Sequence, residues 1–144
     1  MMNIKVHRGL EQIGGCITEI STATSRVFID FGQNLPGNGE ATTPEQDRLM
    51  VENIFATNAK KHEAVFYTHG HEDHVGLFEY IPPYVPQYMS DGTKELLLIK
   101  YRTLKEGVNL CLERLQNDVN STKEQIEEVI VQKSSAEHKI KIIS

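Results

Sequence analysis

Apolar and polar residues alternate at the start of the chain, which is the pattern of β-strands with one buried face. Residues 3–8, NIKVHR, show this alternation at Ile4 and Val6. Residues 27–29 form a nearly continuous apolar run, which is typical of a strand buried on both faces. The four residues 22–25 predict a hairpin between two of the strands. The expected strands cover residues 3–8, 16–22, 25–32, 63–68 and 85–90, with a further strand at 138–144.

Helix starts are marked by capping sequences. Thr43 and Pro44, with a glutamine three residues after the threonine, predict a helix that runs to about Ala59. Ser90 predicts the cap of a long helix from Asp91 to about Asn117, and Ser121 with Glu124 predicts the capping box of a last helix. The apolar residues of the long helix recur every three or four positions and share one stripe. They are Leu97, Tyr101, Leu104, Val108, Cys111 and Leu115.

The order of strands, helix, strand, helical turn, strand and helices predicts an α/β fold. We expect one domain over residues 1–144, with the strands and a metal loop in 1–90 and the helices in 91–137. Pro86 argues for an edge position of the strand at 85–90, because proline cannot donate a hydrogen bond to a neighbouring strand.

Composition narrows the function classes. The net charge is −5 and no block of like charges occurs, so the chain has no general attraction for nucleic acid or anionic lipid. The start, MMNIKVHRGL, contains no apolar signal core, and no apolar run is long enough to span a bilayer. Cys16 and Cys111 lie far apart, and we expect two reduced thiols packed in the interior. A cytoplasmic protein without a membrane segment is therefore expected.

The stretch THGHEDHVG, residues 68–76, contains several side chains that can bind metal ions. His69, His71, Asp73 and His74 are four potential metal ligands that follow an apolar strand. In an extended loop, His69 and His71 can point the same way, and Asp73 with His74 can face a second ion close by. Imidazole and carboxylate together suit zinc, manganese or iron. The pattern therefore predicts a two-metal site at the carboxyl end of the strand.

This motif resembles the signature loop of the metallo-β-lactamase superfamily. The stretches GLEQIGGCITEI and RVFIDFGQNLPG are similar to the amino-terminal strands of its ribonuclease J-like and beta-CASP branch. The resemblance implies an αββα sandwich, of which this chain would form the amino-terminal half with a carboxyl-terminal helical pair. It implies that His69 and His71 ligate a first zinc ion. Asp73 and His74 would ligate a second, with Asp73 also orienting the attacking water.

The resemblance extends to Asp30, which matches an acidic residue behind the metals and would support the histidines. Superfamily members complete the site with a histidine, an aspartate and a last histidine downstream, whereas here His138 is the one histidine after His74. We expect His138 to be a surface residue. The chain then looks like the first half of a longer fold that binds metal weakly and self-associates.

The leading functional expectation is a metal-dependent hydrolase, a ribonuclease J-like RNA phosphodiesterase in its complete form, with two zinc ions or manganese. Two alternatives stay open. One is a hydrolase of the same fold that acts on thioesters or lactones. The other is an inactive fragment that associates as a homo-oligomer. The candidate association surfaces are the apolar stripe from Leu97 to Leu115 and the strand face around Val65 and Tyr67.

Overall fold

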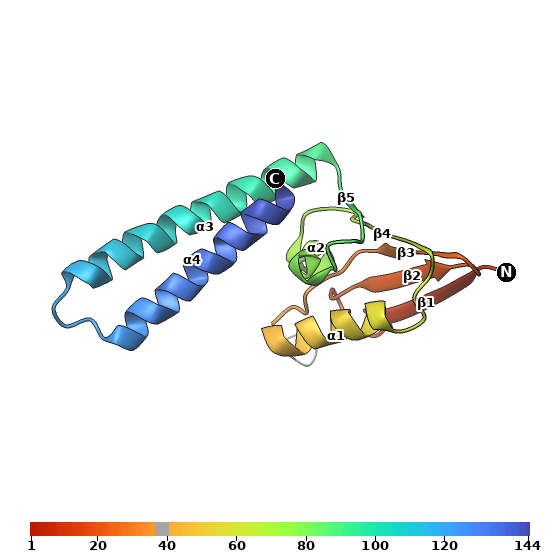
Figure 1. The fold of residues 1–144 in the computed structure, drawn as a ribbon, viewed down its shortest axis with the longest axis horizontal. Coiled ribbons are helices and arrows are strands. Elements are labelled where there is room, and N and C mark those ends of the chain that lie inside the picture. The colour runs from red at the N-terminus through yellow and green to blue at the C-terminus, as the bar shows by residue number, and fades with distance from the viewer. Residues whose placement is uncertain (37–40) are drawn as a thin grey trace. The chain divides into compact units, whose positions relative to one another are not determined.

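The structure is a computed structural model that describes residues 1–36 and 41–144, and it divides into two compact units, residues 1–93 and 94–144 (Figure 1). Over the described residues it is a mixed α/β structure with a carboxyl-terminal helical pair, as the sequence predicts, and it has a five-stranded sheet and four α-helices. The strands are β1 (Asn3–Arg8), β2 (Ile17–Ser21), β3 (Ser25–Ile29), β4 (His62–Phe66) and β5 (Gln87–Tyr88). The helices are α1 (Pro44–Ala56), α2 (Glu72–Val75), α3 (Asp91–Asn117) and α4 (Lys123–Ile143), with a 3₁₀ turn η1 (Phe78–Tyr80).

The sheet has the order β1-β2-β3-β4-β5. The first three strands are antiparallel, and β4 and β5 run parallel to β3. The predicted hairpin at 22–25 is confirmed, since the Thr22 amide donates to the Ser25 carbonyl at 2.8 Å. The predicted edge position near Pro86 is confirmed by β5 at the end of the sheet. The carboxyl ends of β3 and β4 therefore meet at one edge, where the His-rich motif begins.

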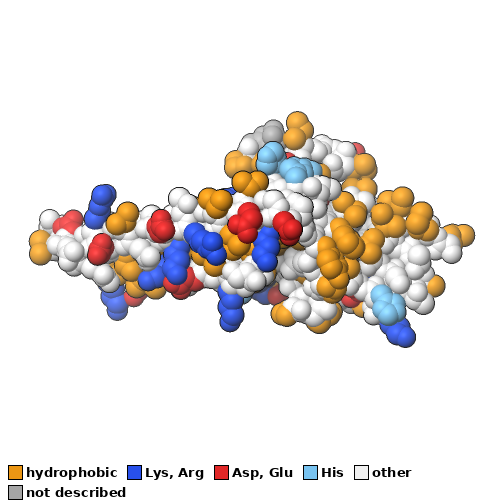
Figure 2. Space-filling model, turned by 90° about the horizontal axis from the view of Figure 1, so that it is seen from above, with side chains coloured by type: hydrophobic (Ala, Val, Ile, Leu, Met, Phe, Trp, Pro, Cys, Tyr) orange, Lys and Arg blue, Asp and Glu red, His pale blue; other side chains and the backbone are white. Residues whose placement is uncertain are grey.

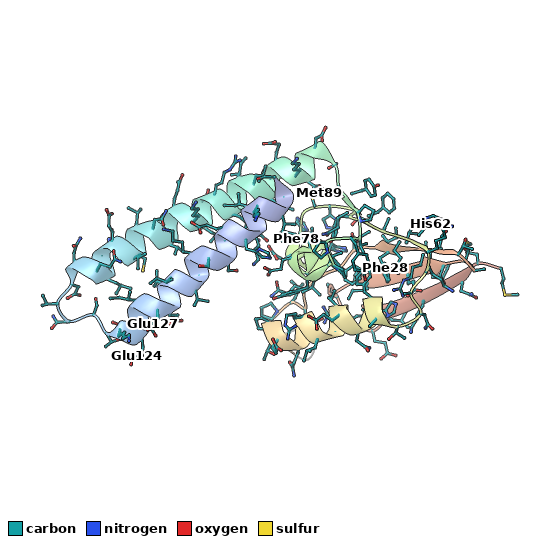
Figure 3. The ribbon with its side chains drawn as sticks, in the orientation of Figure 1. Phe28, His62, Phe78, Met89, Glu124 and Glu127 are labelled. Atoms are coloured by element: carbon teal, nitrogen blue, oxygen red, sulfur yellow. The ribbon has the colours of Figure 1, made fainter. Side chains whose placement is uncertain are left out.

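One face of the sheet packs under α1 and forms the core of the first unit. Phe28 on β3 lies 5.1 Å, ring centroid to ring centroid, from both Phe31 and Phe55, the last of these on α1. Figure 3 shows Phe28 among the side chains between the sheet and α1. The capping box at Thr43 is confirmed, because its side chain accepts the Gln46 amide and the Gln46 side chain accepts the Thr43 amide. The helix ends at Ala56, three residues before the predicted end.

The opposite face of the sheet carries apolar side chains that are exposed or half-buried. The pairing of residues across the strands puts Ile4, Ile20, Val27, Ala64 and Phe66 on this face. Ile4 is 65% exposed and Phe66 is 42% exposed. The sequence-based choice of Val65 and Tyr67 as an association surface is wrong, because both side chains are buried. The error arises from strand register: a shift of one residue exchanges the two faces.

The second unit is a pair of helices that run antiparallel (Figure 1). The long helix begins at Asp91 and ends at Asn117 as predicted. Ser90 accepts the Thr93 amide at 3.1 Å, which is the cap expected of it. Lys105 on α3 pairs with Glu137 on α4 at 3.3 Å. Figure 2 shows basic and acidic side chains interspersed along this pair, as is typical of a solvated helical surface.

Two predictions for the last helix are wrong in detail. The strand expected at 138–144 is the end of α4, where the buried residues Val129, Ala136 and Ile143 recur every seven positions on one helical face. Local alternation at 139–143 suggested a strand, but the longer helical period prevails. The cap is Thr122 with Gln125, one residue after the predicted Ser121 with Glu124. Both candidate pairs satisfy the same sequence pattern, so only backbone geometry distinguishes them.

The exposure of one of the two cysteines differs from the prediction. Cys16 is partly buried, whereas Cys111 is exposed, so the expectation of two interior thiols is wrong for Cys111. Its position on the α3 stripe placed it in the core by periodicity, yet the middle of that stripe is only partly covered, and Leu104 is 49% exposed. Among the described residues, none of the helices has the length and apolar character that crossing a bilayer requires.

Candidate metal site

The His-rich motif begins directly after β4, at the carboxyl edge of the sheet. Backbone bonds extend the strand, since the Tyr67 amide donates to the Tyr88 carbonyl at 2.9 Å. His71 is the N-cap residue of α2, and Asp73 and His74 lie within this single helical turn. The sequence interpretation of the whole motif as an extended loop is therefore wrong for its second half. The helical turn instead sets Asp73 and His74 on successive helical positions.

Asp30 ties the two ends of the motif together. Its carboxylate is buried and accepts hydrogen bonds from the Thr68 amide at 2.8 Å, the Thr68 hydroxyl at 2.8 Å and His74 Nδ1 at 2.7 Å. Its backbone has φ of 64°, a left-handed conformation that aspartate tolerates better than most residues. This turn after β3 aims the carboxylate across the sheet edge toward β4 and α2.

The hydrogen bonds fix which nitrogen of two imidazoles is protonated. An ionised carboxylate only accepts hydrogen bonds, so His74 Nδ1 carries a proton that it donates to Asp30. The Thr68 hydroxyl donates its only hydrogen to Asp30, so its oxygen accepts a hydrogen bond from His69 Nδ1–H, 2.9 Å away. In the neutral form, each ring is left with a lone pair on Nε2, which is the state a metal ligand requires.

The three histidine rings of the motif lie close together. The ring centroid of His69 is 4.7 Å from that of His71 and 4.2 Å from that of His74. Asp73 Oδ2 lies 3.5 Å from His74 Nε2. The three rings are thus neighbours, the Asp73 carboxylate lies beside His74, and His74 contacts the Asp30 carboxylate.

The donors fit a zinc ion in chemistry and in one spacing. Two ligands of a tetrahedral zinc ion, each about 2.1 Å from the metal, are about 3.4 Å apart. The separation of Asp73 Oδ2 and His74 Nε2 matches that value. Among residues 1–36 and 41–144, however, no three His, Cys, Asp or Glu side chains are arranged so that they could hold one ion. The residues present could therefore supply two ligands to an ion, whereas a closed zinc site has four protein ligands.

Two loops bind the backbone of α2 by hydrogen bonds: the loop before β2, which contains Gly15 and Cys16, and the loop after β3, which contains Phe31, Gly32 and Gln33. The Cys16 amide donates to the Asp73 carbonyl at 3.2 Å, the Phe31 amide to His74 at 3.0 Å and the Gln33 amide to Glu72 at 2.9 Å. Three successive carbonyls are thus held from outside the helix. These hydrogen bonds join segments far apart in the chain, so local sequence patterns do not predict them.

Two glycines allow this close approach. A Cβ atom at Gly32 would stand 1.7 Å from the Asp73 carbonyl oxygen. One at Gly14, where φ is 78°, would stand 2.6 Å from the Asp73 Cβ. Both positions therefore require glycine. Both glycines are visible in the sequence, but their approach to Asp73 is decided by the tertiary structure.

His138 lies on α4 and is exposed, as predicted for a surface residue. Thr68 is the residue of this site that sequence reasoning missed. Its hydroxyl connects Asp30 with His69, and its place as the first residue of the motif was the one available signal.

The chain matches curated proteins at low identity, while none of the family models searched matches it. It is 29% identical over 127 residues to an RNase J-like protein of Methanocaldococcus jannaschii, covering 88% of this chain and 26% of that protein. It is 34% identical over 94 residues to the transcription termination factor FttA of Methanosarcina mazei, covering 63% of this chain and 14% of that factor. These matches support the metallo-β-lactamase superfamily at low identity. The chain spans 26% of the length of the first relative and 14% of the length of the second.

The fold also resembles a solved structure. A crystal structure of a protein of unknown function from Enterococcus faecalis V583 aligns with a TM-score of 0.56 and 25% sequence identity. The alignment covers 69% of this chain and 28% of that protein. This likeness concerns the architecture and does not indicate a substrate.

Proposed function

We propose that the chain carries part of the zinc site of a hydrolase that cleaves RNA or another phosphodiester. His69 and His71 are the proposed ligands of one ion, and Asp73 and His74 those of a second. Manganese is the second choice of metal for the same ligands. The name of the RNase J-like relative supports the substrate class. The observation that carries the proposal is the bond of 2.7 Å from His74 Nδ1 to Asp30, which leaves Nε2 available.

Each residue has a defined task in this proposal. Asp30 holds the His74 ring and its proton, and Thr68 does the same for His69. Asp73 presents its carboxylate beside His74 Nε2 and orients the attacking water. A bound zinc ion supplies Lewis acidity, which makes water nucleophilic near neutral pH. The proton of the leaving group is not assigned to a residue of this chain.

Zinc binding measured by calorimetry tests the proposal. We expect the chain to bind zinc weakly, because a catalytic zinc takes three protein ligands and this motif offers two for each ion. Asp30→Asn should weaken the binding by a factor of about 10–100, the usual range when a partner of a ligating histidine is lost. His138→Ala is the matched control, since His138 is exposed on α4, and it should bind zinc like the wild type.

The outcomes separate the parts of the proposal. A wild-type chain with no zinc affinity, or equal loss in Asp30→Asn and His138→Ala, would contradict the metal site. Tight binding of two zinc ions would overturn the expectation that further ligands are needed. Hydrolysis of a single-stranded RNA should be weak or absent for this chain alone, and robust zinc-dependent cleavage would likewise show that the site is complete.

A second candidate function is self-association without catalysis. The apolar face of the sheet, on which Ile4 and Phe66 are exposed, favours it, because apolar surface tends to be covered by association. Sedimentation at micromolar concentration should then show a homo-oligomer, and Phe66→Ser should shift it toward the monomer. A wild-type monomer would contradict this candidate and leave the metal site untouched.

A further inference from the structure

Arg8, the last residue of β1, reaches three partners with one guanidinium. Nε donates to the Gly15 carbonyl at 3.1 Å and Nη2 donates to the Gly32 carbonyl at 2.6 Å. Nη1 donates to Asp47 Oδ1 on α1 at 3.3 Å. The side chain is 13% exposed, and that of Asp47 is 4% exposed. Such a forked, mostly buried arrangement uses the planar geometry that distinguishes arginine from lysine.

A bulge in the sheet directs Arg8 to this position. The pairing of β1 with β2 shifts between Val6 and Arg8, so that Arg8 stands opposite Ile17. Strict alternation would put Arg8 on the face of Val6, which is the exposed face. The bulge turns it to the buried face of Ile17, toward α1.

The two carbonyls that Arg8 binds lie within the loops that grip α2. Gly15 precedes Cys16, whose amide holds the Asp73 carbonyl. Gly32 stands between Phe31 and Gln33, whose amides hold the carbonyls of His74 and Glu72. The Gly32 amide also donates to the Cys16 carbonyl at 3.0 Å, which joins the two loops. Arg8 therefore binds a carbonyl in each of the two loops.

We infer that Arg8 is a positioning residue for the metal motif: through Gly15 and Gly32 it fixes the loops that set the backbone of Asp73 and His74. Its link to zinc rests on the proposed function, whereas its action on the loops does not. Asp47 completes the brace, since it neutralises the guanidinium and also accepts the Thr42 hydroxyl at 2.8 Å. The last residue of β1 is thereby coupled to a motif more than sixty positions away in the sequence.

Amide hydrogen exchange of the full chain without metal tests this inference. In Arg8→Lys, a point charge replaces the fork and cannot bind both carbonyls at once. The amides of Cys16, Phe31 and Gln33 should exchange about tenfold faster, as their bonds to α2 open more often. The Val65 and Tyr67 amides, bound to Pro86 and Tyr88, should not change. The imidazole NMR signals of His74 should shift, because its ring is placed by the same turn.

Arg48→Lys is the matched control. Arg48 lies on α1, pairs with Glu45 and Glu52, and has a side chain that is 40% exposed. It should leave all five amides and the His74 signals as in the wild type. A folded Arg8→Lys protein with wild-type exchange, or a uniform rise in every amide of the sheet, would overturn the inference.

A milder variant keeps the test decisive if Arg8→Lys does not fold. Asp47→Asn retains an oxygen for Arg8 and removes the charge that holds the guanidinium. The same three amides should exchange about threefold faster, and an unchanged or uniform pattern would again overturn the inference. Zinc titration forms the second arm. Loss of zinc affinity in Arg8→Lys with local loosening is the expected result, and a wild-type protein that binds no zinc would contradict only the proposed function.

Discussion

Residues 1–93 and residues 94–144 bury different kinds of side chain. Every buried polar or charged residue that the structure describes lies in the first unit: Glu19, Arg26, Asp30, Asp47 and Thr93. The buried residues of the second unit are apolar, and its ion pairs, such as Lys105 with Glu137, are on the surface. The first unit therefore depends on polar partners brought from far along the chain, whereas the second depends on local helix signals.

This difference indicates which unit is more strongly restricted to a single folded arrangement. A buried charge is costly unless its partners are all in place, so it commits the chain to one arrangement. Arg26 is the extreme case, being 1% exposed, paired with Glu63, and donating to the carbonyls of Ile54 and Thr57 at the end of α1. Among the described residues, helices α3 and α4 contain no buried charged side chain.

Replacement of Arg26 by methionine should have the largest effect on stability. It leaves Glu63 buried without its partner and the last carbonyls of α1 without donors, so we expect a loss of about 3–5 kcal/mol in unfolding free energy. Urea denaturation measures it. Arg48→Met also removes an arginine with two carboxylate partners, but at an exposed site where solvent screens the charges, and should therefore cost much less unfolding free energy than Arg26→Met. Equal losses would contradict the contrast between buried and exposed pairs.

The cap of α4 should have an intermediate effect. Thr122→Ala removes the side chain that accepts the Gln125 amide, and should lower helix stability by about 1 kcal/mol. Ser121→Ala is the control, because among the described residues Ser121 Oγ has no hydrogen-bond partner, and its loss should be neutral or slightly stabilising. Circular dichroism during thermal unfolding compares them. A larger effect of Ser121 would restore the cap predicted from the sequence.

The two cysteines offer the smallest contrast, one in each unit. Burial raises the pKa of the Cys16 thiol, and the negative charges of Asp30 and Asp73 raise it further, while Arg8 opposes them. A raised pKa lowers the thiolate fraction at a given pH, and the thiolate is the nucleophile. Cys111 is exposed and should react with iodoacetamide about tenfold faster at pH 8, with the Cys16 rate rising only at higher pH. Mass spectrometry with Cys16→Ser and Cys111→Ser assigns each site, and equal rates would contradict the description of Cys16.

Much of the secondary structure was predictable from the sequence. The strand at Asn3–Arg8, the cap at Thr43 and the helix Asp91–Asn117 depend on patterns within a few residues, and all are confirmed. The errors fall where two local patterns compete, as at the end of α4, or where register decides which face is buried, as at Val65. The four motif ligands and Asp30 were named from spacing and resemblance, and their binding of metal stays a prediction.

The sequence by itself determined the elements, the motif and the type of chemistry, because helix caps, alternation and ligand identity are properties of neighbouring residues. Only the tertiary structure decided which nitrogen of His69 and His74 is free, that Arg26 is buried, and that Arg8 braces the loops around Asp73. These depend on hydrogen bonds between residues many positions apart. Such bonds exist only once the sheet has fixed its register, since a donor and its acceptor must come within about 3 Å.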